Sequence, residues 1–255
     1  MKYPTLDTHA HITLKHPSRA LEDSGSVLAM TLSLDEAALG VSRKEFSITW
    51  GVGCHPRFPE SQETFDVKWF EALLKRTAVV GEVGLDTSSR VPLECQLKNF
   101  RQVLEVVSRI PRLVSIHSYR AAGLVLQELR QRPITIPVLH WWTGNAEETS
   151  EAVELGCYFS IHSAVARQSK FRTRVPPERI LLESDHSYNN PPSAIPCRIE
   201  WVEDLVAQQF KLDVKEVREL VWRNLAAIVH KTGTWNLLPD TFTTVLSKLE
   251  IQNRE

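Results

Sequence analysis

The sequence has few cysteines, no long apolar run and no excess of charge of one sign. Its 255 residues include only four cysteines, at positions 54, 95, 157 and 197, without the paired spacing of a metal site or a disulfide framework. Isolated cysteines of this kind are typical of reduced thiols in a cytosolic protein. The formal net charge is −1. No overall positive field therefore attracts nucleic acid, and an anionic substrate would need local binding groups.

Membrane-spanning and targeting segments are also missing. No apolar stretch approaches the roughly 20 residues that cross a bilayer, and no basic segment with a long apolar run opens the chain. We therefore expect a soluble, cytoplasmic protein that does not contact membranes. Neither an internal repeat nor a low-complexity linker divides the sequence, and 42% of its residues are hydrophobic. Residues 1–255 are accordingly expected to form one domain with a large core.

Eight short β-type segments alternate with helical patterns through most of the chain. The β-type segments are apolar runs rich in Val, Ile and Leu, typical of parallel strands covered on both faces. They are residues 3–11, 26–33, 47–54, 78–84, 112–117, 136–141, 156–161 and 179–185. Helical periodicity is found at residues 65–76, 93–109, 118–131, 146–155, 198–210 and 213–229. This order predicts an α/β fold, a closed (β/α)₈ TIM barrel rather than an open sheet.

The first of these strands carries the segment DTHAH, residues 7–11. Side chains alternate along a strand, so Asp7, His9 and His11 are expected on one face. Burying two imidazoles and a carboxylate without a partner would be unfavourable, and a divalent metal ion would offset that penalty. The segment therefore predicts a metal-binding strand.

Ionisable side chains recur at the carboxyl ends of five of the other seven expected strands, the third to the sixth and the eighth. In a parallel barrel these ends converge on one face, where catalytic residues lie. The expected metal ligands are His9, His11, Glu82, His117, His140 and Asp185. This donor set suits two divalent ions such as Zn, Mn or Mg, with Glu82 as the bridge and Asp185 also as the general base. We interpret His162 and His230 as ordinary hydrogen-bonding residues.

Several short motifs in this chain resemble those of the TatD family of metal-dependent deoxyribonucleases. In order they are DTHAH, GCHP, GEVGLD with ECQLKNF, VSIHS, HWWTG, PPERILLESD and RNLAAIV, from about residue 5 to residue 230. The resemblance implies a distorted (β/α)₈ barrel of the amidohydrolase type and hydrolysis of DNA phosphodiester bonds, often from an end. It also implies the ligand set His9, His11, Glu82, His117, His140 and Asp185, the residues already selected above.

The segments beside these ligands depart from the family pattern. Tyr119 and Arg120 replace an arginine and an acidic residue, and Thr13 replaces an aspartate. The segment HWWTG stands in place of HxFSG, and no proline follows Asp185 closely. These departures predict retained hydrolysis with an altered substrate or a required protein partner. They are similar to the divergent TatD-like component of the multi-gene Qat anti-phage defence systems.

Loop residues after the strands are candidates for holding DNA. Arg57 and Arg120 are expected to bind phosphates, and His55 is expected beside them at the substrate. Trp142 is expected to stack on an unpaired base, which favours single-stranded or frayed DNA ends. Further basic residues that would complete a basic rim are Lys15, His16, Arg19, Arg90, Arg167, Lys170, Arg172 and Arg174.

Two other functions remain open. The same metal pair would activate water towards an ester or amide, so the protein could be an amidohydrolase-type enzyme acting on a small molecule. It could also be a scaffold subunit with a structural metal site, although the intact ligand set argues against this. A Cys54–His55 nucleophile pair is disfavoured because adjacent strand residues point to opposite faces.

Overall fold

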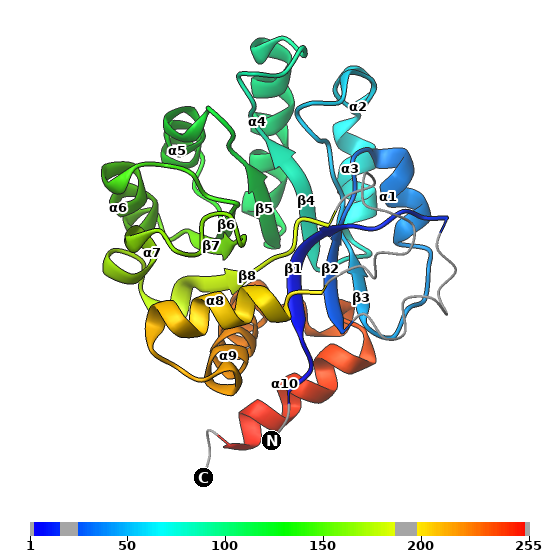
Figure 1. Ribbon diagram of the computed structural model, residues 1–255. Coiled ribbons are helices and arrows are strands. Elements are labelled where there is room, and N and C mark those ends of the chain that lie inside the picture. The colour runs from blue at the N-terminus through cyan, green and yellow to red at the C-terminus, as the bar shows by residue number, and fades with distance from the viewer. Residues whose placement is uncertain (1–2, 16–24, 187–197, 253–255) are drawn as a thin grey trace.

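Parallel strands surrounded by helices form the fold of this chain (Figure 1). The computed structural model describes residues 3–15, 25–186 and 198–252. One sheet has the order β1-β2-β3, formed by Leu6–His11, Ser26–Met30 and Ile48–Trp50. The other has the order β4-β5-β6-β7-β8, formed by Val79–Gly84, Leu113–His117, Ile136–His140, Tyr158–Ile161 and Ile180–Leu182. All eight strands lie inside the segments that the sequence predicts.

Backbone hydrogen bonds join the two sheets at both of their edges. Val52, just after β3, forms a parallel bridge with Val80 of β4. After β8, Asp185 N donates to His9 O of β1 (3.0 Å), and His11 N donates to His186 O (2.6 Å). The strands therefore follow one another in sequence order around a distorted (β/α)₈ barrel. This arrangement places the carboxyl ends of the strands on one face of the molecule.

The helices lie outside the strands, as Figure 1 shows. The six helices that the sequence predicts are α3 (Val67–Leu74), α4 (Leu93–Arg109), α5 (Ala122–Gln131), α6 (Ala146–Glu154), α8 (Glu200–Phe210) and α9 (Val214–Thr232). Those that it does not predict are α1 (Leu34–Gly40), α2 (Pro59–Glu63), α7 (Ser169–Thr173) and α10 (Asp240–Gln252), with the 3₁₀ turns η2 (Pro177–Arg179) and η3 (Trp235–Leu237). Most of these are too short to show helical periodicity in the sequence.

The hydrophobic core lies between the strands and the helices around them. One buried cluster includes side chains from Tyr3 to Leu249, and a smaller one lies around Val27 and Ile48. Every residue of β2 is buried, which explains its uninterrupted apolar sequence. Within the described residues, every helix is too short or too polar to span a bilayer. The expectation that residues 1–255 form one domain stays a prediction.

Candidate metal centre

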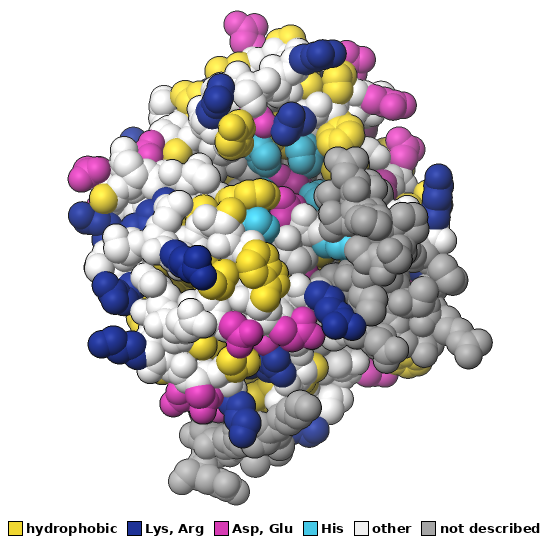
Figure 2. All heavy atoms as spheres, in the orientation of Figure 1, with side chains coloured by type: hydrophobic (Ala, Val, Ile, Leu, Met, Phe, Trp, Pro, Cys, Tyr) yellow, Lys and Arg dark blue, Asp and Glu magenta, His cyan; other side chains and the backbone are white. Residues whose placement is uncertain are grey.

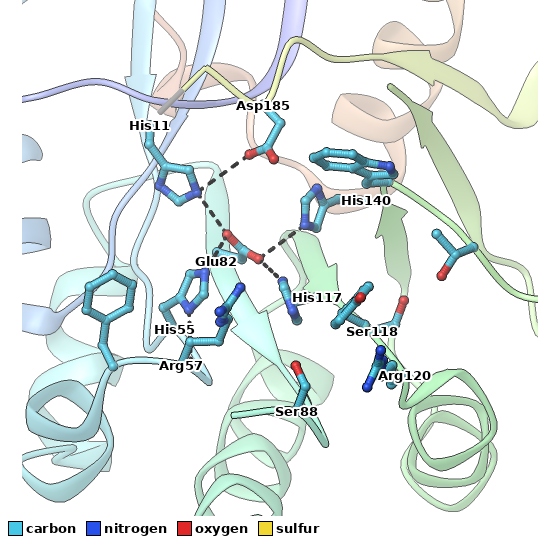
Figure 3. Close-up of a pocket in the computed structure, with 14 residues that line it drawn as sticks. His11, His55, Arg57, Glu82, Ser88, His117, Ser118, Arg120, His140 and Asp185 are labelled. Carbon is cyan, nitrogen blue, oxygen red and sulfur yellow. Dashed lines mark hydrogen bonds and ion pairs between the residues drawn. The ribbon is translucent and has the colours of Figure 1, made fainter. Parts of the chain in front are cut away.

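Histidine side chains converge on the carboxylate of Glu82, which lies in β4; Figure 3 shows four of them, His11, His55, His117 and His140. Five imidazole nitrogens surround its two oxygens. Their distances from the nearer oxygen are 2.5 Å for His117 Nδ1, 2.9 Å for His11 Nε2, 3.1 Å for His140 Nε2, 3.2 Å for His55 Nε2 and 3.4 Å for His9 Nε2. Glu82 is 1% exposed, so these groups meet away from bulk water. Burying so many charged and polar groups together costs desolvation free energy, which strong interactions within the cluster must offset.

Asp185 completes the predicted set at the rim of this cluster. Its Oδ1 lies 3.7 Å from His9 Nε2 and 4.0 Å from His11 Nε2. The side chain is 20% exposed, whereas that of His9 is fully buried. Asp185 is therefore the carboxylate of the set that water reaches most easily.

The six predicted ligands separate into two groups of three. The donor atoms of His9, His11 and Asp185 lie within 4.8 Å of one another, and so do those of Glu82, His117 and His140. The groups adjoin each other because His9 and His11 both lie next to Glu82. Two cation positions a short distance apart are the arrangement that this geometry would support.

His9 gives the clearest sign that these side chains fit a metal ion. Its Nδ1 lies 2.7 Å from Ser115 Oγ, which fixes the orientation of the ring. Its Nε2 is buried and has no hydrogen-bond partner among the described residues, although it points at two carboxylates. A metal-binding imidazole has this pattern, with one nitrogen held by a neighbouring group and the other directed at the ion. Nitrogen and oxygen donors together suit zinc, manganese or magnesium.

The protonation state that burial favours at His9 agrees with a ligand role, whereas nearby carboxylates raise the pKa values of His11, His117 and His140. Burial lowers the pKa of His9 to about 4, which keeps the imidazole neutral and its lone pair available. Burial opposes the ionisation of Glu82, but the charges of His55, His140 and His117 hold the pKa of its carboxyl well below the ordinary value. At Asp185 burial dominates and raises the pKa to about 6. Glu82 is thus the permanent anion of the cluster.

Three buried carboxylates around the cluster were not among the predicted site residues. Glu183 Oε1 lies 3.2 Å from His140 Nδ1, and Asp86 Oδ2 lies 3.1 Å from His117 Nε2. Asp7 accepts hydrogen bonds from Ser184 N (3.1 Å) and Ser184 Oγ (2.5 Å), immediately before Asp185 in the chain. Each of the three therefore holds a predicted ligand or the residue next to one.

Two of these carboxylates have a signal in the sequence. Asp7 precedes His9 by two residues, and Glu183 precedes Asp185 by two. Even spacing places residues on the same face of an extended segment, so an acidic residue at such a spacing from a ligand is a candidate for holding it. Asp86 lies beyond the end of β4 at Gly84, so strand alternation does not identify it.

The cluster forms the floor of a cavity of about 850 Å³, a size typical of ligand pockets. Figure 2 shows the histidine side chains grouped in the middle of this face, with hydrophobic and basic side chains beside them. Lining residues above the floor include Arg57, Phe58, Tyr119, Arg120 and Trp141. The cavity is therefore lined by His55, Arg57 and Arg120, at the positions expected from the sequence.

Trp142 does not line the cavity. Its side chain is 0% exposed, and its indole Nε1 donates to Thr149 Oγ1 (2.9 Å). The ring lies edge-on to Phe159, with a centroid separation of 6.2 Å. The expectation that Trp142 stacks on a base is therefore wrong, because burial in the core leaves no face of its ring for a ligand. Trp141 lines the cavity in its place.

We expect Trp142→Ala to destabilise the protein. Removing a fully buried aromatic side chain creates a cavity and costs about 3–5 kcal/mol of unfolding free energy. Chemical denaturation followed by circular dichroism measures the change. The matched control is Trp201→Ala, since the Trp201 side chain is 57% exposed and its loss should change stability by at most about 0.5 kcal/mol. Equal stability of the two variants would contradict the buried position.

Those of the other basic loop residues that the structure describes do not line the cavity. Lys170 Nζ donates to Gly144 O (2.6 Å), and an Arg174 guanidinium nitrogen donates to Ser150 Oγ (3.0 Å). His16 and Arg19 lie outside the described residues. Arg57 lies 3.6 Å from Asp86, whereas Arg120 forms no ion pair with any described residue. Arg120 is thus the cavity-lining guanidinium that is most available to an anion.

Cys54 takes no part in the cluster. Its thiol lies against Ser61 O and Gln62 Nε2, at 3.4 and 3.1 Å. Burial raises the pKa of the thiol to about 12, so the reactive thiolate is not formed near neutral pH. This agrees with the expectation that no cysteine–histidine nucleophile operates here.

Comparison with known proteins places this chain in a family. A family model described as TatD related DNase matches residues 6–230. Mouse TATDN3 is 25% identical over 252 residues, covering 86% of this chain and 86% of the mouse protein. Bacillus subtilis YabD, named as a metal-dependent hydrolase, is 21% identical over 243 residues, covering 87% and 94%. Edwardsiella piscicida TatD, named as a 3'-5' ssDNA/RNA exonuclease, is 27% identical over 178 residues, covering 65% and 68%.

A solved structure shows the same fold. YjjV, a TatD homologue from Escherichia coli K12, superposes with a TM-score of 0.74 at 19% identity, covering 88% of this chain and 97% of YjjV. The fold that the alternating strands and helices predict is therefore confirmed.

Proposed function

This chain belongs to the TatD-related DNase family, and from that premise we propose that it hydrolyses phosphodiester bonds of DNA. It is a metal-dependent hydrolase of this family, and the DNA substrate is the part that we add. The observation that carries the proposal is the Glu82-centred cluster on the floor of a cavity whose wall holds Arg120, an arginine without an ion pair to any described residue. A phosphodiester would present its anionic oxygens to Arg120 and its reacting phosphorus to the cluster.

The two groups of three ligands would each hold one divalent ion, Zn, Mg or Mn. His9, His11 and Asp185 would form one site, and Glu82, His117 and His140 the other, with Glu82 close enough to His9 and His11 to serve both. When bound, such ions would make a water molecule more acidic and offset negative charge on the phosphoryl group. The buried His9 Nε2 supports the fit of a metal ion at this site, because it has no hydrogen-bond partner among the described residues.

The protein side chains would have separate roles around the reacting phosphate. Asp185 is the partly exposed carboxylate at the rim, and in this proposal it takes the proton of the attacking water. Arg120 and Arg57 bind non-bridging phosphate oxygens, and His55, which lines the cavity beside Glu82, contacts the substrate. Glu183 and Asp86 hold the imidazoles of His140 and His117 in position.

We extend to this chain the single-stranded DNA substrate and the exonuclease activity that the name of Edwardsiella piscicida TatD states. The support within this chain is the mixture of cationic and aromatic side chains on the cavity wall, since this mixture binds unpaired nucleotides with little sequence preference. We also propose that the protein acts in the cytoplasm, on the basis of its isolated cysteines.

A role beside protein partners in an anti-phage defence system is the most specific part of the proposal. Its support is sequence alone, namely departures from the family pattern such as Tyr119, Arg120 and Thr143 next to an intact ligand set. Phage plaque counts would test it, on cells that carry the genes of the proposed defence system. The two strains compared would encode this chain with Glu82 or with the substitution Glu82→Ala. Equal plaque counts would remove this part of the proposal without affecting the hydrolase.

The first test combines elemental analysis with a nuclease assay. Purified protein is analysed for bound metal and incubated with 5'- or 3'-labelled single-stranded DNA in the presence of Mg, Mn, Zn or a chelator. About two ions per chain and metal-dependent shortening from one end would support the proposal. Bound metal with hydrolysis of small esters or amides but not DNA would replace it with the amidohydrolase alternative.

We expect Arg120→Ala to weaken substrate binding without loss of metal. The guanidinium has no carboxylate partner to satisfy among the described residues, so its loss should raise KM for DNA by roughly 10-fold, as expected for one charge-assisted hydrogen bond. Steady-state kinetics and elemental analysis measure the two effects. Arg109→Ala is the control, because Arg109 lies in the last turn of α4 and pairs with Glu71. An unchanged KM for every cleaved DNA would contradict the role of Arg120.

A further inference from the structure

Trp141 is held in an unusual backbone conformation beside the metal cluster. Its φ angle is 40°, in the left-handed region that residues other than glycine rarely adopt. The backbone N–H of Trp141 donates to Glu183 Oε1 (2.8 Å), the same oxygen that lies 3.2 Å from His140 Nδ1. One buried carboxylate therefore fixes both a predicted metal ligand and the residue after it. Strained backbone that is held this firmly is found most often at functional sites.

The Trp141 indole stands as a wall of the cavity. It stacks on the His162 ring with a centroid separation of 3.8 Å and an interplanar angle of 27°. The side chain is only partly buried and lines the cavity. His162 supports one face of the indole, so the ring is positioned before any ligand arrives. The histidine that the sequence suggested as an ordinary hydrogen-bonding residue thus has a packing role here.

Two further aromatic side chains line the same cavity. Tyr119 is 45% exposed and Phe58 is 42% exposed, which is unusual for large hydrophobic groups in this protein. Arg120 lies over the Tyr119 ring, 5.5 Å from its centroid. Exposed flat rings with guanidinium groups between them are typical of sites that bind unpaired nucleotides through base stacking and phosphate contacts.

We propose that Trp141, supported by His162, is the stacking surface for the nucleobase next to the scissile phosphate. Because Trp141 directly follows His140, a base on its indole would leave the attached phosphate beside Glu82. A paired base in a duplex has both faces covered by its neighbours, whereas an unpaired base has a face free for the indole. Trp141 is therefore a specificity-determining residue that selects single-stranded ends. This inference rests on the proposed function, since it assigns the substrate of the same site.

Equilibrium binding tests this role without dependence on turnover. Fluorescence anisotropy is measured with a labelled single-stranded oligonucleotide and with the same oligonucleotide carrying abasic nucleotides at both ends. The parent protein is Asp185→Asn, in which cleavage is suppressed. Trp141→Ala should weaken binding of the complete oligonucleotide by about 5- to 100-fold, the range for one stacked base, and change binding of the abasic one by less than about 2-fold. Trp141→Phe should restore most of the affinity.

Trp69→Ala is the matched control, because Trp69 is an exposed tryptophan of α3 that does not line the cavity. It should leave both affinities unchanged. In the otherwise unmodified enzyme, Trp141→Ala should raise KM for single-stranded DNA and change kcat much less, which separates substrate stacking from a structural defect in the metal cluster.

The results separate this inference from the proposed function. Equal weakening on the complete and abasic oligonucleotides, or no weakening on either, overturns the stacking role. Base-dependent binding by a chain that cleaves no DNA overturns the proposed hydrolysis and supports the stacking surface. Absence of binding to both oligonucleotides overturns both proposals.

Discussion

Glu82→Ala should abolish hydrolysis and lower the metal content of the purified protein. Glu82 is the anion on which five imidazoles converge, and its carboxylate is buried at the centre of the cluster. Removing it takes away a predicted ligand and the negative charge that balances the cations. We expect kcat/KM to fall by more than about 10³-fold, beyond the loss for one electrostatic stabilising group. Kinetics on labelled DNA and elemental analysis of the same preparation measure both effects.

Glu82→Gln distinguishes loss of charge from loss of folding. It retains the volume and one oxygen, so the circular dichroism spectrum should match that of the wild type while activity stays low. Glu105→Ala is the matched control, since Glu105 lies on α4 with a side chain that is 64% exposed. Full activity in folded Glu82→Ala protein would show that hydrolysis does not depend on this cluster.

Asp185→Asn should lower kcat while much of the bound metal remains. The amide retains an oxygen donor for the ion, but it cannot accept the proton of an attacking water. Loss of a general base lowers rates by roughly 10²- to 10⁴-fold. The side chain lies at the rim, 3.7 Å from His9 Nε2, so the substitution leaves the contacts of Glu82 in place. The measurements are kcat on labelled DNA and metal content on the same samples.

The comparison with Asp35→Asn controls for loss of a surface carboxylate, since Asp35 is an exposed residue of α1. Asp35→Asn should retain wild-type kcat. If kcat of Asp185→Asn fell only in proportion to its loss of bound metal, Asp185 would be a metal ligand alone. The general base would then be another group. An unchanged kcat at full metal content would exclude both roles.

Local sequence patterns predicted the strands and the end of the barrel at which the site lies. Parallel strands covered on both faces need apolar side chains in both directions, so β2 and β4 are recognisable as short apolar runs. Polar residues at the carboxyl ends of such runs can only gather on one face of a barrel. His9, His11, Glu82, His117, His140 and Asp185 were therefore identifiable together, and the structure brings all six into one cluster.

Helices without a clear periodic pattern were not predictable in the same way. The five-residue helices α2 and α7 contain little more than one turn, so no apolar stripe develops in their sequences. The longer α10 also went unpredicted, although it buries Phe242 and Leu246 against the rest of the core. Packing stabilises such segments, and packing depends on neighbours that are distant in the sequence.

The order of the strands and the identity of the candidate ligands could be read from the sequence, because both follow from alternation over a few residues. How neighbouring side chains divide between core and cavity depends on packing between distant segments. Trp141 and Trp142 are adjacent and chemically identical, yet Thr149 accepts the indole N–H of one inside the core and His162 stacks on the other at the cavity. Glu183 likewise contacts His140, which lies 43 residues away in the chain, and no spacing in the sequence pairs these two residues. Contacts between segments that only folding brings together leave no local pattern to read.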